Sequence, residues 1–277
     1  MTHPVVSPIE AALTSRYGDA AAGLAPLWND TIAALLSHRS VRAFLPGPLP
    51  QGTVEAAVAA AQSAPSSSNL QTWSVVAIED PATKAKLAEY ANGQTHVAEA
   101  PLVLAFLADL ARLEEIGRRR DHPTDALAFL ETLLIGFIDA ALAAQNAVVA
   151  LESLGLGTVY LGAIRNRPVE VAELLHLPPN VVAVVGLVVG HPDPARPAAV
   201  KPRLPQRVVL HRERYDASQP PDAIDGYDRT LAEFQRGQNL PPAGWIDAAL
   251  QRVRGPQSLS GRDRLKEALI ALGFGLR

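Results

Sequence analysis

The segment from Thr132 to Leu154 constrains the fold more than any other part of this chain. It is apolar on nearly every side if it is helical, and its main interruptions are Asp139, Gln145, Asn146 and Glu152. A helix that is hydrophobic all round is either buried in a protein core or embedded in a bilayer. Because the polar interruptions fit a core better than lipid, we expect a central buried helix.

Shorter segments with strand and helix patterns surround this one. Apolar and β-branched runs predict strands, and alanine-rich segments and turn residues between them predict helices. Gly155 is the expected stop of the central helix, and Asp80 followed by Pro81 is a typical helix start. The alternation predicts a layered α/β or α+β domain. The expected strands are 73–79, 102–108, 156–160 and 181–189, and the expected earlier helices are 31–36, 53–64 and one that begins at Pro81.

Other regions have a less regular pattern. Residues 112–125 are charged and contain Pro123, so we interpret them as a surface excursion. Prolines in residues 191–205 forbid regular structure, while arginine and lysine accumulate there. Farther along, amphipathic patterns predict three helices, at about 223–236, 245–254 and 262–272.

These patterns divide the chain into three parts. Residues 1–30 are an N-terminal extension in which 9–22 could form a helix, and residues 31–207 form the main domain. Residues 208–277 are a C-terminal excursion with too few aliphatic residues for an independent core. We expect this excursion to wrap the main domain or a partner subunit.

Composition excludes several classes of protein. The 277-residue chain has no cysteine, which rules out disulfides, thiolate metal sites and cysteine nucleophiles. A formal net charge of -3 gives no field that would hold a nucleic acid. The seven histidines have no metal-ligand spacing, and the start of the chain lacks a signal-peptide pattern. We therefore expect a cytoplasmic protein without a metal, a nucleic-acid partner or a membrane span.

Common catalytic signatures are absent, and three loop clusters remain. The sequence has no nucleophile elbow, P-loop, zinc-protease pair or dinucleotide fingerprint. Cations and small hydroxyls gather instead at residues 38–42, 66–69 and 201–203. Each cluster alone is typical of a solvated surface. Together they offer fixed cations for a phosphate and short hydroxyls for a sugar-like chain, as a phosphorylated cofactor requires.

Five motifs in a fixed order carry a family resemblance. They are SHRSVRAF, APSSSNLQTWSVV, NGQTHV, AQNAVVALESLGLGTVYLGAIRN and KPRLP. The series closely resembles the FMN-dependent nitroreductase superfamily, and within it the NADPH-dependent flavin reductases and oxygen-insensitive major nitroreductases. The resemblance covers about residues 31–277. It implies an α+β fold, namely a three-layer α/β/α sandwich, and a homodimer with FMN at its interface and a C-terminal segment exchanged onto the partner.

The resemblance also implies which residues bind FMN. His38, Lys201 and Arg203 would neutralise the phosphate, and Ser40 would contact the ribityl region. Arg42 would lie against N1 and the C2 carbonyl of the ring, where a fixed guanidinium favours the anionic reduced form. For Arg39 two interpretations remain open, a cofactor contact and a surface salt bridge.

Further implied contacts come from a serine loop, a glutamine and a later strand. Ala163 stands where the family usually has a second glycine, so we expect an acceptor pocket that is tighter by a methyl group. The implied residues are Ser66, Ser67 and Ser68 from the second subunit with Gln71 supporting their loop, Gln94 at the pyrimidine edge, and Tyr160, Leu161, Gly162 and Ala163 beside flavin N5.

Four polar residues near these motifs have an ordinary structural interpretation. Asp139, Gln145 and Asn146 lie on the central helix, and Asp139 and Asn146 share one face of it. We interpret them as a satisfied polar network at the dimer core, because flavin chemistry needs no protein acid beyond solvent. For His96 in NGQTHV, we favour a loop histidine over a flavin contact.

The implied activity is a ping-pong two-electron reduction. NADPH would pass a hydride to FMN, and the reduced flavin would then reduce a small acceptor such as a nitroaromatic, a quinone or a flavin. Arg236 and Arg262 would bind the 2'-phosphate of NADPH, with Arg264 as an alternative to Arg262. Two alternatives remain open: a flavin-destroying or dehalogenating enzyme of the same fold, and a flavin-binding protein without turnover.

Overall fold

The computed structural model describes residues 7–216, 218 and 221–277. They form two compact units. The sheet unit contains residues 40–197 and 259–277, and the helical unit contains residues 7–39 and the described part of 198–258. One junction between the units is the peptide bond between Arg39 and Ser40.

The sheet unit is built on four antiparallel strands. Their order is β1 (Trp73–Ile78), β2 (Leu102–Asp109), β4 (Val181–Gly190) and β3 (Gly157–Leu161). The inner strands β2 and β4 are buried along nearly their whole length. Such strands are covered on both faces, which explains why they read as continuous apolar runs. All four predicted strands are confirmed.

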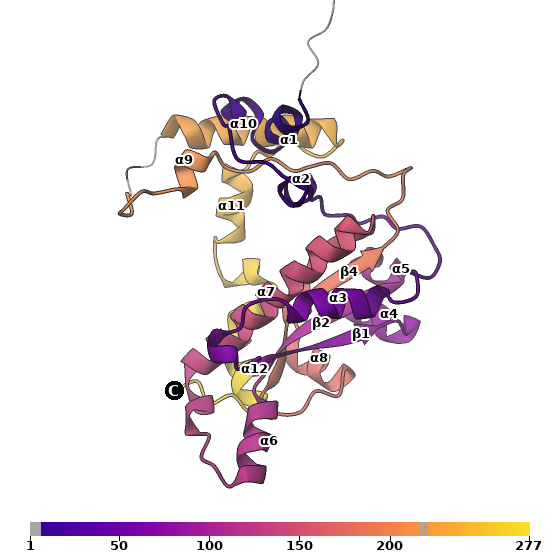
Figure 1. Cartoon of the computed structure of the whole chain (residues 1–277), viewed down its shortest axis with the longest axis vertical. Helices are drawn as coiled ribbons and strands as arrows, with labels where there is room; N and C mark the ends of the chain where they lie inside the picture. Colours follow the sequence, from indigo (N-terminus) through magenta and orange to yellow (C-terminus); the bar gives the residue numbers. More distant parts are fainter. Residues whose placement is uncertain (1–6, 217, 219–220) are drawn as a thin grey trace, which may run out of the picture. The chain divides into compact units, whose positions relative to one another are not determined.

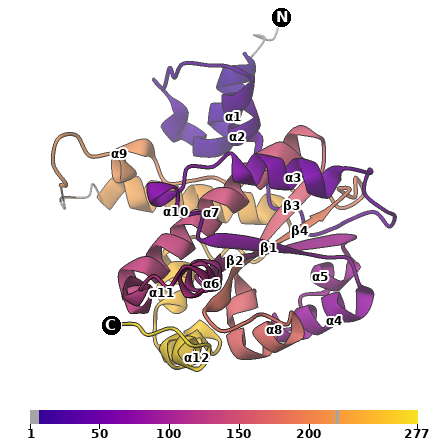
Figure 2. The ribbon, with the colours of Figure 1, turned by 60° about the horizontal axis from the view of Figure 1, so that its bottom comes forward.

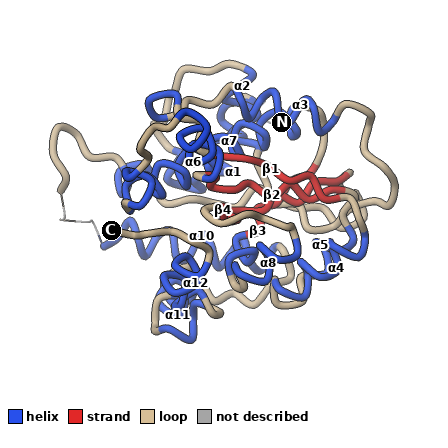
Figure 3. Tube along the Cα trace, turned by 90° about the horizontal axis from the view of Figure 1, so that it is seen from below, coloured by secondary structure: helices blue, strands red, loops and turns tan. Residues whose placement is uncertain are grey.

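Helices cover both faces of this sheet (Figure 1). On one face lie α3 (Thr53–Gln62) and the long α7 (Leu130–Ser153), and on the other lie α4 (Pro81–Tyr90), α5 (Thr95–Glu99) and α8 (Pro168–Leu174). Figures 2 and 3 show the strands between these two layers. The predicted α+β fold and α/β/α sandwich are confirmed.

The central helix α7 packs its alanine-rich side on the sheet. Ala140, Ala143, Ala144 and Ala147 are fully buried there. Among the described residues, α7 is the one helix long and apolar enough to cross a membrane by length and composition. Its packed side identifies it as the core helix of the sandwich, as the sequence predicts.

Two local signals in the sequence are confirmed in atomic detail. The side chain of Asp80 accepts a hydrogen bond from the Thr83 N–H at 2.8 Å and caps α4. Gly155 has φ +80 directly after α7, a left-handed conformation that glycine adopts without strain.

The segment of residues 112–125 lies on the surface, as predicted. It contains a helix, α6 (Ala111–Arg120), of which only Gly117 is buried. Asp121 ends the helix with φ 47, so Pro123 follows the last turn and breaks nothing. The segment lies on the surface, but it is regular. The last helix, α12 (Leu265–Ala271), follows a short turn (Arg262–Arg264) near its predicted place.

The helical unit contains α1 (Pro8–Tyr17), α2 (Asp30–Ser37), α9 (Gln206–Val209), α10 (Pro221–Gly237) and α11 (Ile246–Arg252). The amphipathic pattern of α10 is confirmed, because Ala223, Tyr227 and Leu231 are buried at intervals of four. A side-chain oxygen of Asp228 accepts hydrogen bonds from the N–H groups of Trp245 and Ile246, which starts α11.

Candidate functional site

The segment that carries Ser40 and Arg42 runs beside strand β3. Ser40 forms a parallel bridge with Thr158, and the Val41 N–H donates to the Thr158 carbonyl at 2.9 Å. Val41 and Ala43 are buried while Arg42 is exposed. The alternation of an extended segment therefore directs the Arg42 guanidinium outward.

Two glycines allow this segment to lie close to the sheet. A Cβ atom on Gly157 would be 2.9 Å from the Val41 side chain, and a Cβ atom on Gly190 would be 2.6 Å from the Phe44 ring. Both separations are too short for real side chains. The strands that flank the predicted flavin segment thus need glycine at these two positions.

The segment predicted to lie beside flavin N5 ends strand β3. Tyr160 and Leu161 are its last residues, and Gly162 and Ala163 begin a short 3₁₀ turn. The Tyr160 hydroxyl donates to the side-chain oxygen of Gln145 at 3.1 Å. Burial, with a smaller contribution from Glu152, raises the pKa of Tyr160. Tyr160 is therefore a neutral hydrogen-bonding group near neutral pH.

The histidine predicted to lie in a loop is buried in a helix. His96 belongs to α5 and is 8 % exposed, so the loop interpretation is wrong. Burial and the nearby Arg42 charge lower the pKa of His96. Its Nε2 atom is buried, and no described residue gives it a hydrogen-bond partner. A buried polar atom of this kind calls for a partner, such as a bound ligand.

Gln94 precedes this helix and is half-buried. Its side-chain amide nitrogen donates to the Ala91 carbonyl at 2.9 Å. No described residue donates to its side-chain oxygen, so the oxygen is the part of this amide that remains for a ligand.

The serine loop, residues 66–71, is held from inside by Asp139. This carboxylate is 2 % exposed and accepts four hydrogen bonds. The donors are the Ser66 hydroxyl at 2.7 Å, the Ser67 N–H at 3.3 Å, and the N–H and hydroxyl of Thr72, both at 3.1 Å. Asp139 is therefore a satisfied structural anchor, as expected, although its partners lie in the same chain and not in a second subunit.

Asn146 is not part of that network. Its side-chain amide donates to the Ala60 carbonyl at 3.1 Å, which joins α7 to α3. The prediction of one shared network for Asp139 and Asn146 is thus wrong, because each residue fixes a different neighbour of the same helix.

The backbone of the serine loop is held in an uncommon conformation. Ser68, Asn69 and Gln71 have φ values of 47°, 54° and 51°, a region that non-glycine residues rarely occupy. The Gln71 N–H donates to the Ser66 hydroxyl at 2.8 Å, and its side-chain amide donates to Asn69 Oδ1 at 3.3 Å, so Gln71 contacts the loop through both its main chain and its side chain. Ser67 and Ser68 remain exposed. Strain of this type is often found at ligand-binding sites.

The predicted phosphate cations lie in the helical unit. Lys201 and Arg203 are exposed on either side of the buried Pro202, whose carbonyl accepts a hydrogen bond from the Tyr227 hydroxyl at 3.2 Å. His38 is half-buried just after α2, and Arg39 is exposed. The Arg39 guanidinium donates to the Ser37 carbonyl at 3.3 Å, so neither of its two interpretations is decided.

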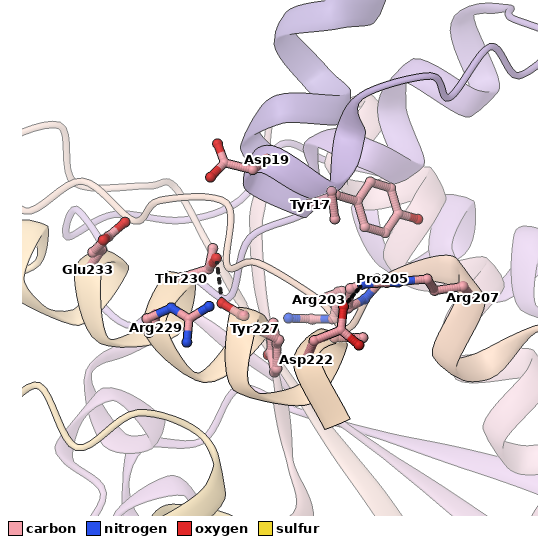
Figure 4. Close-up of a pocket in the computed structure, with 13 residues that line it drawn as sticks. Tyr17, Asp19, Arg203, Pro205, Arg207, Asp222, Tyr227, Arg229, Thr230 and Glu233 are labelled. Atoms are coloured by element: carbon pink, nitrogen blue, oxygen red, sulfur yellow. Dashed lines mark hydrogen bonds and ion pairs between the residues drawn. The ribbon is translucent and has the colours of Figure 1, made fainter. Parts of the chain in front are cut away.

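A pocket of about 340 Å³ lies beside Arg203 in the helical unit (Figure 4). Arginine and acidic side chains line it in equal numbers, and Arg207 pairs with Asp222 at 3.1 Å. The pocket itself therefore has no excess charge that would select an anion. The charged lining residues are Arg203, Arg207, Arg229, Asp19, Asp222 and Glu233.

The arginines predicted for NADPH belong to different units. Arg236 is exposed in the last turn of α10 in the helical unit. Arg262 is half-buried in the sheet unit and donates to the Leu259 carbonyl at 2.9 Å, whereas Arg264 is exposed. In the described part of the chain, no group of three histidine or acidic side chains could hold a metal ion.

Sequence reasoning missed one residue of the helical unit. Arg16 on α1 is only 6 % exposed and donates hydrogen bonds to the main-chain carbonyls of His38 and Lys201. Its partners are main-chain carbonyls far away in the sequence, which no local pattern reveals.

Comparison with known proteins covers almost the whole chain. Residues 35–191 match the pattern of the nitroreductase family, and residues 201–277 match its C-terminal domain. An FMN reductase [NAD(P)H] of Bacillus subtilis is 41% identical over 211 residues, which are 74% of this chain and 83% of that protein. An oxygen-insensitive NADPH nitroreductase of Salmonella typhimurium is 42% identical over 223 residues, 79% of this chain and 89% of that protein.

Solved structures have the same fold. NfrA2 of B. megaterium has a TM-score of 0.84 and 36% identity, with 90% of this chain and 100% of that chain covered. The NADPH:FMN oxidoreductase of Vibrio harveyi, solved in complex with NAD+, has a TM-score of 0.79 and 34% identity, with 90% and 100% covered.

Proposed function

Because the chain belongs to the nitroreductase family, we propose that it is an FMN-containing, NADPH-dependent oxidoreductase that reduces small acceptors. Relatives named FMN reductase, NADPH nitroreductase and NADPH-flavin oxidoreductase support this activity. The observation that carries the proposal is the pair of Arg42 and His96. An outward guanidinium lies near a buried imidazole whose Nε2 has no described partner.

This pair fits the polar edge of a flavin. The ring offers carbonyl oxygens and nitrogens along its pyrimidine side, and the free oxygen of Gln94 precedes His96 by two residues. The Arg42 guanidinium, the His96 ring and the Gln94 side-chain oxygen together offer donors and acceptors to the polar atoms on this side of the flavin ring. When bound, FMN supplies the two-electron redox chemistry. The protein residues bind, orient and tune it.

We assign the other predicted residues to the remaining parts of FMN. His38, Lys201 and Arg203 would hold the phosphate, because Lys201 and Arg203 carry positive charges and the His38 ring can add a hydrogen bond. Ser40 would contact the ribityl chain, with Arg39 as a further candidate. The serine loop, Ser66, Ser67, Ser68 and Gln71, would contact FMN across the subunit boundary, and the end of β3, Tyr160, Leu161, Gly162 and Ala163, would run beside N5.

We propose a homodimer that pairs through the exposed side of α7. Leu134, Ile138 and Leu142 follow one another at intervals of four and are 48%, 57% and 40% exposed. A continuous apolar stripe of this kind is rare on a monomer. In a two-fold interface, the same stripe of each subunit packs against the other. The opposite side of α7 is already packed on the sheet. The C-terminal segment would be exchanged onto the partner.

We place the reaction in the cytoplasm, where NADPH is the common donor, and we assign Arg236 and Arg262 to its 2'-phosphate. Residues 1–30, 31–207 and 208–277 would serve as extension, FMN domain and C-terminal excursion. A nitroaromatic, a quinone or a free flavin is the proposed acceptor, because reduction by a flavin needs no protein acid beyond solvent.

Anaerobic mixing with NADPH tests the proposal. We expect the visible absorbance of the bound flavin to bleach and to return when a quinone or a nitroaromatic is added. NADH, which lacks the 2'-phosphate, serves as the control electron donor. A protein that keeps its flavin colour with NADPH would be a flavin-binding protein without turnover. A flavin that bleaches but does not recolour with any acceptor would favour a flavin-destroying or dehalogenating activity.

A further inference from the structure

The side chain of Arg16 joins two segments that lie far apart in the sequence. Its Nη1 donates to the Lys201 carbonyl at 2.8 Å. Its Nη2 donates to the Leu36 carbonyl at 2.7 Å and to the His38 carbonyl at 3.0 Å. One guanidinium thus fixes the main chain at two of the proposed phosphate cations.

The main chain of Arg16 is tied to the third cation. The Arg203 N–H donates to the Arg16 carbonyl at 2.8 Å. Arg16 lies in the last turn of α1, where carbonyls lack partners within the helix. The same residue therefore contacts the main chain at His38, Lys201 and Arg203.

Arg16 suits this task because of its shape. It is 6 % exposed, and a buried guanidinium needs acceptors for its donors. The planar fork donates in several fixed directions, which a lysine ammonium does not reproduce. Its hydrogen-bond acceptors are all carbonyls, and within the described residues it has no carboxylate partner.

The positive charge of Arg203 acts on Arg16. Burial lowers the pKa of Arg16, and the nearby positive charge of Arg203 lowers it further. Cations held near one another in this way repel, and a bound phosphate would relieve the repulsion.

We infer that Arg16 is a positioning residue for the proposed FMN phosphate site, and that residues before the family match take part in cofactor binding. The match begins at residue 35, so Arg16 lies outside it. The inference rests on the proposed function. Arg16 does not have to touch the phosphate, because it fixes the main chain from which the three cations project.

Titration of flavin-free protein with FMN and with riboflavin, which lacks the phosphate, tests the inference. Quenching of flavin fluorescence gives both affinities. For Arg16→Met we expect FMN affinity to fall about ten- to a hundredfold, with riboflavin affinity changed by less than about threefold. Arg16→Lys should lie between Arg16→Met and the wild type, because it keeps the charge and loses the fork.

Leu13→Ala is the matched control. Leu13 is buried one turn earlier on α1 and has no polar side-chain atom, so its loss loosens the same helix and leaves the preference for FMN unchanged. If Arg16→Met loses affinity equally for FMN and riboflavin, or loses none for either, the inference is overturned. If Arg16→Met does not fold, full retention of the preference in Arg16→Lys overturns it. A wild-type protein without any preference for FMN would instead contradict the proposed function.

Discussion

The serine loop of the sheet unit and the cationic segments of the helical unit are held by buried residues of opposite charge. Asp139 accepts four hydrogen bonds from the loop and from Thr72. Arg16 donates three to the segments around His38 and Lys201. In both regions a buried residue satisfies main-chain groups of the segment that carries the predicted ligand contacts.

The two anchors differ in how visible they are in the sequence. Asp139 interrupts an apolar helix, and a carboxylate in such a place must be satisfied. Arg16 lies on α1 between Ser15 and Tyr17, where an arginine resembles any surface residue. A buried anchor is therefore predictable where its surroundings are apolar, and invisible where they are polar.

Removal of the sheet-unit anchor should have the largest effect. Asp139→Ala leaves the buried N–H and hydroxyl of Thr72 without an acceptor, and at about 1–3 kcal/mol for each donor the free energy of unfolding should fall by about 3 kcal/mol. Asn146→Ala on the same helix removes one hydrogen bond and should cost about 1 kcal/mol. Urea denaturation measures both. Equal small losses would show that Asp139 is no anchor.

A smaller effect is expected on NADPH, for which each unit supplies one candidate. Arg236→Ala and Arg262→Ala should each lose a charge-assisted contact of about 1.5–3 kcal/mol, or about ten- to a hundredfold in kcat/KM for NADPH. The same constant for NADH, which lacks the 2'-phosphate, should stay unchanged.

Two further variants sharpen this measurement. Arg252→Ala removes an exposed arginine from the last turn of α11 and is the control for Arg236. A loss in Arg264→Ala in place of Arg262→Ala would move the second role to that neighbour. Equal losses for NADPH and NADH would place phosphate recognition elsewhere.

The smallest effect is expected at Arg42. Its charge favours the anionic reduced form of the flavin, so Arg42→Ala should lower the midpoint potential. Because Arg42 is exposed and solvent screens it, we expect a decrease of about 30 mV, or about 1.4 kcal/mol for two electrons. Arg39→Ala is the neighbouring control and should leave the potential unchanged. Spectroelectrochemical titration gives both values, and an unchanged potential in Arg42→Ala rejects the assignment.

The fold could be predicted well because burial leaves a pattern. Strands β2 and β4 are covered on both faces and consist of continuous apolar residues. Helix α6 was missed because its charged residues face solvent and Pro123 follows closely. The burial of His96 was missed for a different reason: α5 has five residues, too few to show a helical period.

The candidate site could be predicted only in part. The motifs located Arg42, the serine loop and the end of β3, because these segments have distinctive residues in a fixed order. The hydrogen bonds from Arg16 span up to 185 residues, and no local pattern contains such a contact. The unpartnered Nε2 of His96 is likewise a property of the packed structure and not of the sequence.

The central claim is that the protein is a dimer with one FMN in each subunit. Native mass spectrometry of the purified, flavin-loaded protein tests this claim most directly. We predict a dimer that carries two noncovalent FMN molecules and releases them on denaturation. A monomer that retains FMN, or a dimer that releases FAD or takes up no flavin, would contradict it.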